Sequence, residues 1–263
     1  MKRLILIITL ITILVSGTLL SGCVRVDMSA KNGPITTREY SFTDFTAIEA
    51  GSIFEIEVIP SDNYSIAITT GENVLKRIHV SKSGSTLKID METWLFTWHT
   101  APKVTITMPA LYKLDLSGAS KGDVKLFKSD HDFNLSLSGA SELDIDMEMG
   151  KFIAQISGAG RVRGNIIASG SDMEFSGAAH MEINGSGGNM KLHGSGASSF
   201  SLEDYTLNDA DVELSGTSHA SLYLGGRLDA NLSGASSLEY AGSPTLGHTN
   251  TSGASSINQK TVH

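Results

Sequence analysis

The chain has 263 residues, 40% of them hydrophobic, and a formal net charge of −8 at pH 7. This length is sufficient for one domain with a sizeable hydrophobic core. An acidic chain without a basic cluster is a poor partner for nucleic acid or for anionic lipid headgroups, so the composition argues against a nucleic-acid-binding protein. Cys23 is the single cysteine, which excludes an intramolecular disulfide, and the fold must therefore rely on its core.

The N-terminus has the three parts of a bacterial secretory signal. Residues 1–3 are positively charged, residues 4–20 are mainly apolar, and the small residues of a Leu-Ser-Gly-Cys motif end at Cys23. This motif resembles the bacterial lipobox, which implies a signal peptide over residues 1–22 and a lipid on the Cys23 sulfur. An uncleaved N-terminal anchor helix is the alternative. In both cases we expect the remaining chain to be extracytoplasmic and tethered to a membrane, with residues 23–34 as a polar linker.

Apolar and polar residues alternate in four runs within residues 35–116, which is the pattern of strands with one buried face. The runs begin at Phe54, Tyr64, Leu87 and Val104. No strict repeat links them. We therefore expect irregular rungs here that cap one end of the regular structure that follows.

An aromatic cluster interrupts this part of the chain. Trp94, Phe96 and Trp98 alternate along the sequence, and both tryptophans of the protein are among them. On a strand these three rings would share one face. They are either a lid on the end of the fold or an exposed platform for a glycan or a partner protein, since tryptophan clusters form binding hot spots. We treat them as the candidate ligand-binding residues.

The tetrapeptide Ser-Gly-Ala-Ser, or a close variant, occurs eight times after residue 116. The spacings between copies are 21, 19, 19, 19, 20, 18 and 19 residues. A period near 19 residues is typical of a solenoid, in which one structural unit stacks on itself. The copies begin at Ser117, Ser138, Ser157, Ser176, Ser195, Ser215, Ser233 and Ser252.

Short alternating runs flank each tetrapeptide. In the copy at Ser138, Leu135 and Leu137 precede the motif, and Leu143 and Ile145 follow it, each pair separated by one polar residue. This pattern predicts that each unit forms a strand, a tight corner, a second strand and a looser turn. The glycine found in all eight copies suits the corner, because it tolerates positive φ and close backbone approach. We expect the small alanine after it to point into the interior of the corner.

Two short strands per 19 residues cannot bury their own apolar faces, so the units must stack as rungs about 4.8 Å apart. The sequence predicts an all-β fold, a parallel β-helix domain over residues 35–258 with regular repeats over 117–258. The Gly-Gly-x-Gly-x-Asp nonapeptide of calcium-binding β-rolls does not occur. In the last repeat, polar residues stand where other repeats are mainly apolar, which we interpret as a polar cap. These residues are Thr249, Thr251, Asn258 and Gln259.

The reiterated Leu-x-Leu-Ser-Gly-Ala-Ser core and the lead-in from Val104 to Gly118 resemble the head GIN domain, a family named for auto-transporter adhesins. The stretch from Phe45 to Val58 resembles the opening strands of that domain. The resemblance covers about residues 38–257. It implies a right-handed, single-stranded β-helix and a location at the cell envelope or surface, and it supplies no catalytic residues.

Two groups of polar residues could bind a metal. Four carboxylates alternate along one expected strand, and a hard cation such as calcium would suit them. They are Glu142, Asp144, Asp146 and Glu148. Arg161 and Arg163 align with the first two on the next rung, and Glu182 then faces Arg163, so cross-rung ion pairs are the favoured interpretation. His180 and His219 share a column but lie two rungs, roughly 10 Å, apart, too far for one metal. The sequence thus indicates no metal and no cofactor.

Catalysis has little support in the sequence. Arg161 and Arg163 beside Glu174 and Glu182 form the cluster most similar to the site of a polysaccharide-cleaving β-helix, but ion pairing explains these charges equally well. The sequence therefore predicts no catalytic residues. It favours a membrane-anchored lipoprotein that acts as a non-catalytic, adhesin-like binding module for a glycan or an envelope protein. A polysaccharide-active enzyme and a purely structural spacer are the alternatives.

Overall fold

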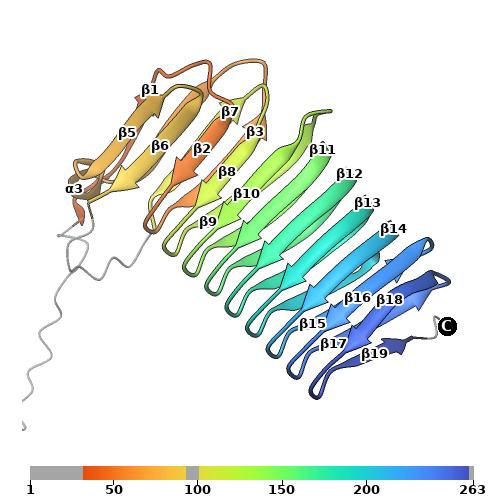
Figure 1. Cartoon of the computed structure of the whole chain (residues 1–263). Helices are drawn as coiled ribbons and strands as arrows, with labels where there is room; N and C mark the ends of the chain where they lie inside the picture. The colour runs from red at the N-terminus through yellow and green to blue at the C-terminus, as the bar shows by residue number, and fades with distance from the viewer. Residues whose placement is uncertain (1–31, 93–100, 261–263) are drawn as a thin grey trace, which may run out of the picture.

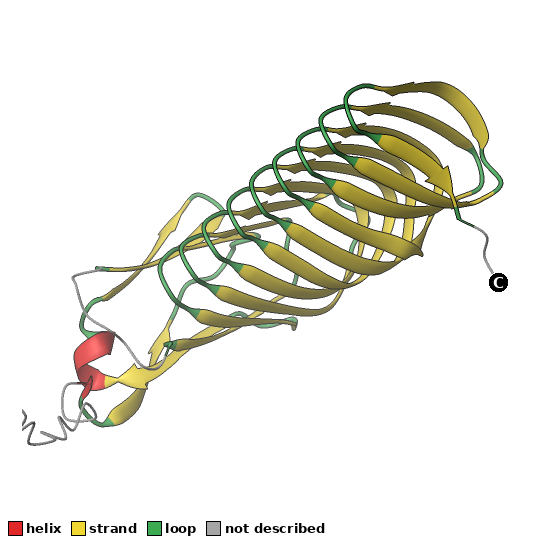
Figure 2. Cartoon of the chain, turned by 90° about the horizontal axis from the view of Figure 1, so that it is seen from below, coloured by secondary structure: helices red, strands yellow, loops and turns green. Residues whose placement is uncertain are grey.

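The computed structural model describes residues 32–92 and 101–260. They form a β-solenoid of about 8 turns, in which parallel strands about 19 residues apart stack on one another. Figure 1 shows the rungs following one another along a single axis, and in Figure 2 the tight corners form a row along one edge. The predicted all-β solenoid with rungs of about 19 residues is therefore confirmed.

The described residues before position 117 hold eight strands and a short helix. They are β1 (Ile35–Tyr40), β2 (Ala47–Ala50), β3 (Glu55–Pro60), β4 (Ser65–Gly71), α3 (Glu72–Leu75), β5 (Ile78–Ser83), β6 (Thr86–Met91), β7 (Lys103–Met108) and β8 (Lys113–Leu116). The strands of the regular repeats come after them. They are β9 (Lys121–Lys128), β10 (Phe133–Leu137), β11 (Glu142–Ile156), β12 (Arg161–Phe175), β13 (His180–Gly194), β14 (Ser199–Leu214), β15 (His219–Leu224), β16 (Arg227–Leu232), β17 (Ser237–Gly242), β18 (Thr245–Thr251) and β19 (Ser256–Gln259).

The solenoid has two walls of parallel strands. The first wall contains β3, β9, the first halves of β11 to β14, and then β15, β17 and β19. The second wall contains β2, β8, β10, the second halves of β11 to β14, and then β16 and β18. Equivalent repeat positions stack in register, as Glu142, Arg161 and His180 do. Each outward position therefore forms a column along the axis.

The glycine corners join the two walls and continue the backbone ladder. All eight corner glycines have φ between 72° and 87°. A Cβ atom on Gly158 would lie 2.4 Å from the carbonyl oxygen of Gly139, one rung earlier. That carbonyl accepts a hydrogen bond from the backbone N–H of Ala159 at 2.8 Å. The requirement for glycine is thus twofold, because both the left-handed backbone and the close approach exclude a side chain.

The expectation that the corner alanine points inward is wrong. Ala140 and Ala159 lie exposed at the tip of the corner, and the fourth residue is the buried one. Ser141 is fully buried, and its hydroxyl donates to the carbonyl oxygen of Ser138 at 2.9 Å. That carbonyl points into the corner, so a buried donor satisfies it. The same contact recurs at Ser120, Ser198, Ser218 and Ser236.

A complete rung lies outside the regular repeat. The β2–β3 rung pairs with β8–β9 on one side and with β6–β7 on the other. The order of rungs in space therefore differs from their order in the chain. The corner between β2 and β3 is Gly51-Ser52-Ile53-Phe54, where Ser52 takes the glycine position with φ of 83°. Its carbonyl oxygen accepts from the N–H of Ala119 at 2.7 Å, as a corner glycine would.

Antiparallel strands and the short helix cover the β6–β7 end of the solenoid. Strand β4 pairs antiparallel with β7 and with β1, and β5 pairs antiparallel with β6. Val74 and Leu75 of α3 and Ile78 of β5 are buried in the same core cluster as the rungs. This end of the hydrophobic core is therefore closed. The candidate residues Trp94, Phe96 and Trp98 lie between β6 and β7, outside the described residues.

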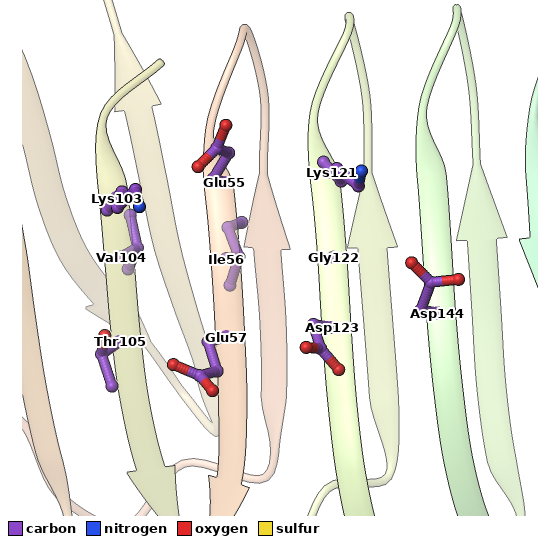
Figure 3. Close-up of a pocket in the computed structure, with 10 residues that line it drawn as sticks. All are labelled: Glu55, Ile56, Glu57, Lys103, Val104, Thr105, Lys121, Gly122, Asp123 and Asp144. Atoms are coloured by element: carbon purple, nitrogen blue, oxygen red, sulfur yellow. The ribbon is translucent and has the colours of Figure 1, made fainter. Parts of the chain in front are cut away.

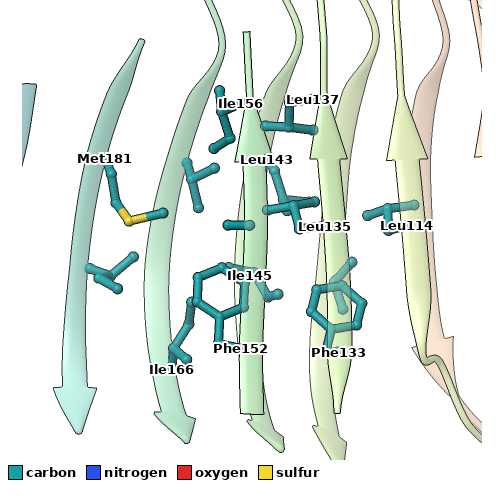
Figure 4. Packing of buried hydrophobic residues seen from close by; sticks show 14 of the residues in the cluster. Leu114, Phe133, Leu135, Leu137, Leu143, Ile145, Phe152, Ile156, Ile166 and Met181 are labelled. Carbon is teal, nitrogen blue, oxygen red and sulfur yellow. The ribbon is translucent and has the colours of Figure 1, made fainter. Parts of the chain in front are cut away.

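Inward side chains stack in columns between the two walls (Figure 4). Phe133 and Phe152, on neighbouring rungs, stack with ring centroids 6.3 Å apart and an interplanar angle of 8°. One polar pair is buried among the apolar residues: the Tyr205 hydroxyl lies 2.9 Å from the Ser171 hydroxyl. Burial raises the pKa of Tyr205 to about 12.

We predict that Gly158→Val destabilises the protein by about 1–3 kcal/mol, because the corner requires positive φ and leaves no room for Cβ. The unfolding free energy from urea titration measures this effect. Ala159→Thr is the matched control, since this position is exposed and Thr217 fills its equivalent in another repeat. An unchanged stability of the Gly158 variant would contradict our account of the corner.

Because of Tyr205, we predict that the folding stability of the protein changes with pH in the alkaline range. In the unfolded chain its phenol ionises near pH 10, and in the folded chain only at about 12, so the folded state loses stability as the pH rises through this interval. Comparing the wild type with Tyr205→Phe at pH 8 and pH 11 isolates this group, because the other titrations cancel. Between pH 8 and pH 11, we expect the unfolding free energy of the wild type to fall by about 1.4 kcal/mol relative to that of the variant. The same difference at both pH values would show that burial does not raise this pKa.

Candidate binding surfaces of the two walls

A shallow groove runs along the outer face of the second wall beside the corner serines. Two adjoining depressions form it, and both are lined by Glu174 and Ser176 of the β12 rung. The groove crosses β10, β11, β12, β13, β14 and β16. Six rungs at about 4.8 Å per step give it a length of about 24 Å.

Two rows of polar side chains line this groove, one residue of each row on every rung. The first row consists of the opening serine of each corner: Ser138, Ser157, Ser176, Ser195, Ser215 and Ser233. The second row lies two residues earlier in the chain: Ser136, Gln155, Glu174, His193, Glu213 and Asn231. Their stacking follows from the parallel register, in which Gln155 pairs with Glu174 and Glu174 with His193. The groove therefore presents hydrogen-bonding groups at the rung spacing.

Part of this hydrogen-bonding capacity is unused within the protein. In the described residues, the side chains of Gln155, Glu174 and Ser176 form no hydrogen bond or ion pair. His193 is 3.1 Å from Glu213, and the Ser195 hydroxyl donates to the carbonyl oxygen of Phe175 at 3.2 Å. The groove thus combines fixed polar groups with groups that are free to bind a ligand.

The outer face of the first wall carries a ladder of alternating charge near the capped end. Lys103, Glu55, Lys121, Glu142 and Arg161 occupy one column on successive rungs. Figure 3 shows the three members nearest the cap at the edge of a pocket. Glu142 forms ion pairs with Lys121 at 3.8 Å and with Arg161 at 3.7 Å. The Glu142–Arg161 pair expected from the sequence therefore forms, and Lys121 extends it by one rung.

Three of the four carboxylates considered as a calcium site, Glu142, Asp146 and Glu148, have other partners. Asp146 accepts a hydrogen bond from Asn165 at 3.3 Å, and Glu148 lies 3.0 Å from Lys128. Arg163 pairs with Glu182 at 3.6 Å. In residues 32–92 and 101–260, no group of three or more His, Cys, Asp or Glu residues is arranged to hold a metal ion.

Other candidates are separated by the fold. Glu174 lies on the second wall, whereas Arg161 and Arg163 lie on the first half of β12 in the first wall, so the enzyme-like cluster is not assembled. His180 and His219 stand in one column with Ser199 between them, as the repeat predicts. Cys23, like the aromatic cluster, lies outside the described residues. No helix in the described part of the chain is long and apolar enough to cross a membrane.

The groove is not predicted from the sequence, although the sequence contains one signal of it. The residue two positions before each corner serine is polar in all eight repeats, whereas its two neighbours are mostly apolar. This pattern predicts an outward column. It does not show that the column borders a depression, because that depends on how far the corner serines stand out from the wall.

Solved structures with a similar fold include the following three. A protein from Parabacteroides distasonis ATCC 8503, described as a "putative lipid binding protein", is 20% identical, with a TM-score of 0.79 over 87% of this chain and 98% of that chain. A "putative adhesin" from Parabacteroides merdae ATCC 43184 is 15% identical, with a TM-score of 0.81 over 87% and 97%. A "putative adhesin" from Bacteroides fragilis NCTC 9343 is 18% identical, with a TM-score of 0.65 over 87% and 97%. At these identities the likeness shows the fold alone.

No curated protein matches the chain. A family model does, over residues 44–244, and this range includes the β2–β3 rung, the cap except β1, and most of the regular repeats. The chain belongs to the family described as "Putative auto-transporter adhesin, head GIN domain".

Proposed function

We propose that the protein is an adhesin-like module, held at the cell surface by a lipid on Cys23, that binds an extended, hydroxyl-rich ligand such as a glycan chain along the serine groove. Membership of an adhesin family indicates an extracytoplasmic or surface location. The observation that carries the proposal is the six-rung groove with its two rows of hydrogen-bonding side chains.

The spacing and chemistry of the groove favour a chain of sugars. The rung repeat of about 4.8 Å is close to the length of one sugar residue in an extended polysaccharide. Each rung offers a serine hydroxyl and a second polar side chain, which suit the donor and acceptor pairs of sugar hydroxyls. A single hydrogen bond contributes only about 0.5–1.5 kcal/mol, so useful affinity requires several rungs in series. An extended ligand meets that requirement.

The charge of the groove restricts the kind of glycan. Asp172, Glu174 and Glu213 line it, and the lining itself contains no lysine or arginine, although Asp172 is paired with Lys151 at 3.0 Å. Such a surface repels polyuronates and other acidic polysaccharides. The proposal is therefore a neutral or basic glycan and a non-catalytic role. The same charge disfavours the alternative of an enzyme that cleaves acidic polysaccharides.

The attachment to the membrane is tested at Cys23. We expect Cys23→Ser to abolish labelling of the protein by fatty acid and to release it from the membrane fraction, because the serine hydroxyl does not replace the thiol as a lipid acceptor. Ser21→Ala is the matched control, since it changes the motif and keeps the cysteine. Persistent lipid labelling of the Cys23 variant would contradict the assignment.

The binding site is tested by truncating three neighbours in the second row. We expect Gln155→Ala, Glu174→Ala and His193→Ala together to weaken binding to neutral glycans on an array by about 100-fold, since each lost hydrogen bond contributes about 1 kcal/mol. All three side chains are exposed, so the fold should survive, which circular dichroism verifies. A control variant with Glu182→Ala and Ser201→Ala changes the first wall instead.

The aromatic segment is the rival site in the same assay. If Trp94→Ala with Trp98→Ala abolishes glycan binding and the groove variant binds normally, the ligand sits on the aromatic residues and the groove assignment is wrong. If neither the wild type nor the variants bind a neutral, basic or acidic glycan, the proposed ligand class is wrong. A purely structural spacer is then the favoured interpretation.

A further inference from the structure

The end of the solenoid formed by β18 and β19 is open. Strand β18 pairs only with β16, and β19 only with β17, among the described strands. Leu246 stacks on Leu228 and Ile257 on Leu238, in line with the apolar core. Leu228 and Leu238 are fully buried, whereas Leu246 is 51% exposed. The last rung therefore exposes both the end of the core and a row of unpaired backbone groups.

The two ends of the solenoid differ in how they are closed. The opposite end is covered by α3 and the antiparallel strands β1, β4 and β5 (Figure 1). Its edge strands are β1, which carries Arg38 and Glu39, and β5, which carries Lys82, and charged side chains on an edge discourage pairing with another chain. Stacking of the open end onto the capped end is thus blocked, which leaves a second open end as the fitting partner.

The open end lacks the charges that would keep two copies apart. Strands β18 and β19 contain no lysine, arginine, aspartate or glutamate, although the chain has a net charge of −8. Lys260 follows β19 and is paired with Glu203 at 3.3 Å and with Glu239 at 3.7 Å. Threonine occupies three of the seven positions of β18 and favours strand pairing. Two such ends can approach without electrostatic repulsion.

A bulge defines which part of the edge can pair. The register between β16 and β18 shifts between Leu228 and Ala230, where Gly247 and His248 stand opposite Asp229. The backbone N–H of His248 donates to the Asp229 carboxylate at 2.7 Å, which fixes the bulge. The regular edge therefore lies on the corner side: residues 249–251 of β18 and residues 256–259 of β19.

We propose that the open ends of two copies pair end to end about a twofold axis parallel to these strands, with β18 of each copy antiparallel to β19 of the other. This arrangement brings corner against corner, so both regular stretches meet and both bulges lie outside the contact. The inward residues then match in register: Thr251 faces Ile257 of the second copy, and Thr249 faces Gln259. Asn250 faces Asn258 on the outer side. The interface is self-complementary, as a twofold dimer requires.

The contact is small, so the pairing is weak. Four residues of strand span about 13 Å and the walls are about 10 Å apart, which encloses about 130 Å², and the width of the two edge strands brings the contact to the order of 300 Å² per copy. Standard stable interfaces bury about 800 Å² per partner. We therefore expect dissociation constants of tens of micromolar or weaker in solution. Many copies held on one surface would strengthen the attachment by avidity.

The geometry assigns a role to this pairing, which rests on the proposed anchoring through Cys23. Asn32, the first described residue, lies at the capped end, opposite to β18 and β19 (Figure 1). In an end-to-end pair the two anchors therefore lie at opposite extremes of the dimer. Two such anchors insert into facing membranes, so the pairing is homophilic adhesion between surfaces that carry the same protein.

The test places charges on the two outward asparagines. Asn250→Lys with Asn258→Lys sets like charges opposite each other at both strand pairs, and Asn250→Asp with Asn258→Asp does the same with the opposite sign. Residues 24–263, which include every described residue, are followed by sedimentation velocity from about 5 to about 500 µM, a range that brackets the expected weak affinity. We expect an elongated wild-type dimer, at least about tenfold weaker association of either variant alone, and recovery when the two variants are mixed.

The controls separate the interface from the fold and from the groove. Asn184→Lys with Asn208→Lys adds the same charge in the middle of the solenoid, on exposed positions, and should leave the dimer unchanged. At the groove, the Asn250/Asn258 variants lose the hydrogen bond that the Asn250 amide donates to Asn231 at 3.3 Å, and they should still bind the glycan of the wild type through the other five rungs. A wild type that stays monomeric throughout, or a dimer that persists in the lysine variant, would overturn the proposed pairing.

Adhesion itself is tested with the lipidated full chain in phosphatidylcholine vesicles. Wild-type vesicles should cluster, lysine-variant vesicles should not, and lysine-variant vesicles mixed with aspartate-variant vesicles should cluster again. A dimer in solution without clustering of vesicles would overturn the contact between facing membranes and keep the end-to-end pair. Clustering that survives in the lysine variant would assign adhesion to another surface.

Discussion

The hydrogen bond from the third corner residue to the glycine carbonyl one rung earlier sustains the whole solenoid. It recurs at 2.7–2.8 Å through every corner, from Ala119 to Ala254. At each corner the chain passes from one wall of strands to the other. A parallel ladder would ordinarily end there and leave backbone groups unpaired. Because the corner backbone is left-handed and closely approached, the ladder passes through it only where glycine, or once Ser52, takes the position. The register of both walls depends on this continuity.

A fold held by its backbone in this way leaves the outward positions free to vary. The outward column that starts at Lys103 contains lysine, glutamate, arginine, histidine and serine along the axis, with the same pairing underneath. Inward positions are restricted by packing to apolar side chains and a few satisfied polar ones, such as Tyr205. Binding chemistry can therefore change rung by rung without cost to the core, which is the physical reason for seeking function on the outer columns and at the two ends.

The regular rungs could be predicted from the sequence because period, alternation and corner glycine all point to the same structure. The β2–β3 rung could not, since its corner has no Ser-Gly-Ala-Ser and its neighbours in space come later in the chain. The prediction that the corner alanine points inward is wrong for a related reason. Residue size favours Ala140 in a crowded interior, but the buried carbonyl of Ser138 requires a donor, and the hydroxyl of Ser141 supplies it. A local hydrogen bond, and not residue size, therefore determines which corner residue is buried.

The position of the binding surfaces follows from the same physics. A solenoid needs both ends of its core protected, yet here the covering helix and antiparallel strands are found at one end, and the other has polar threonines with an uncharged edge. The polar residues of the last rung reduce exposed apolar area, but backbone groups on a strand edge remain without a protein partner whatever the side chains are. Polar substitution alone is thus an incomplete cap. An edge with no charge and a defined bulge behaves as a selective surface, since a partner must match its short regular stretch, and the chain whose edge matches it by symmetry is its own copy.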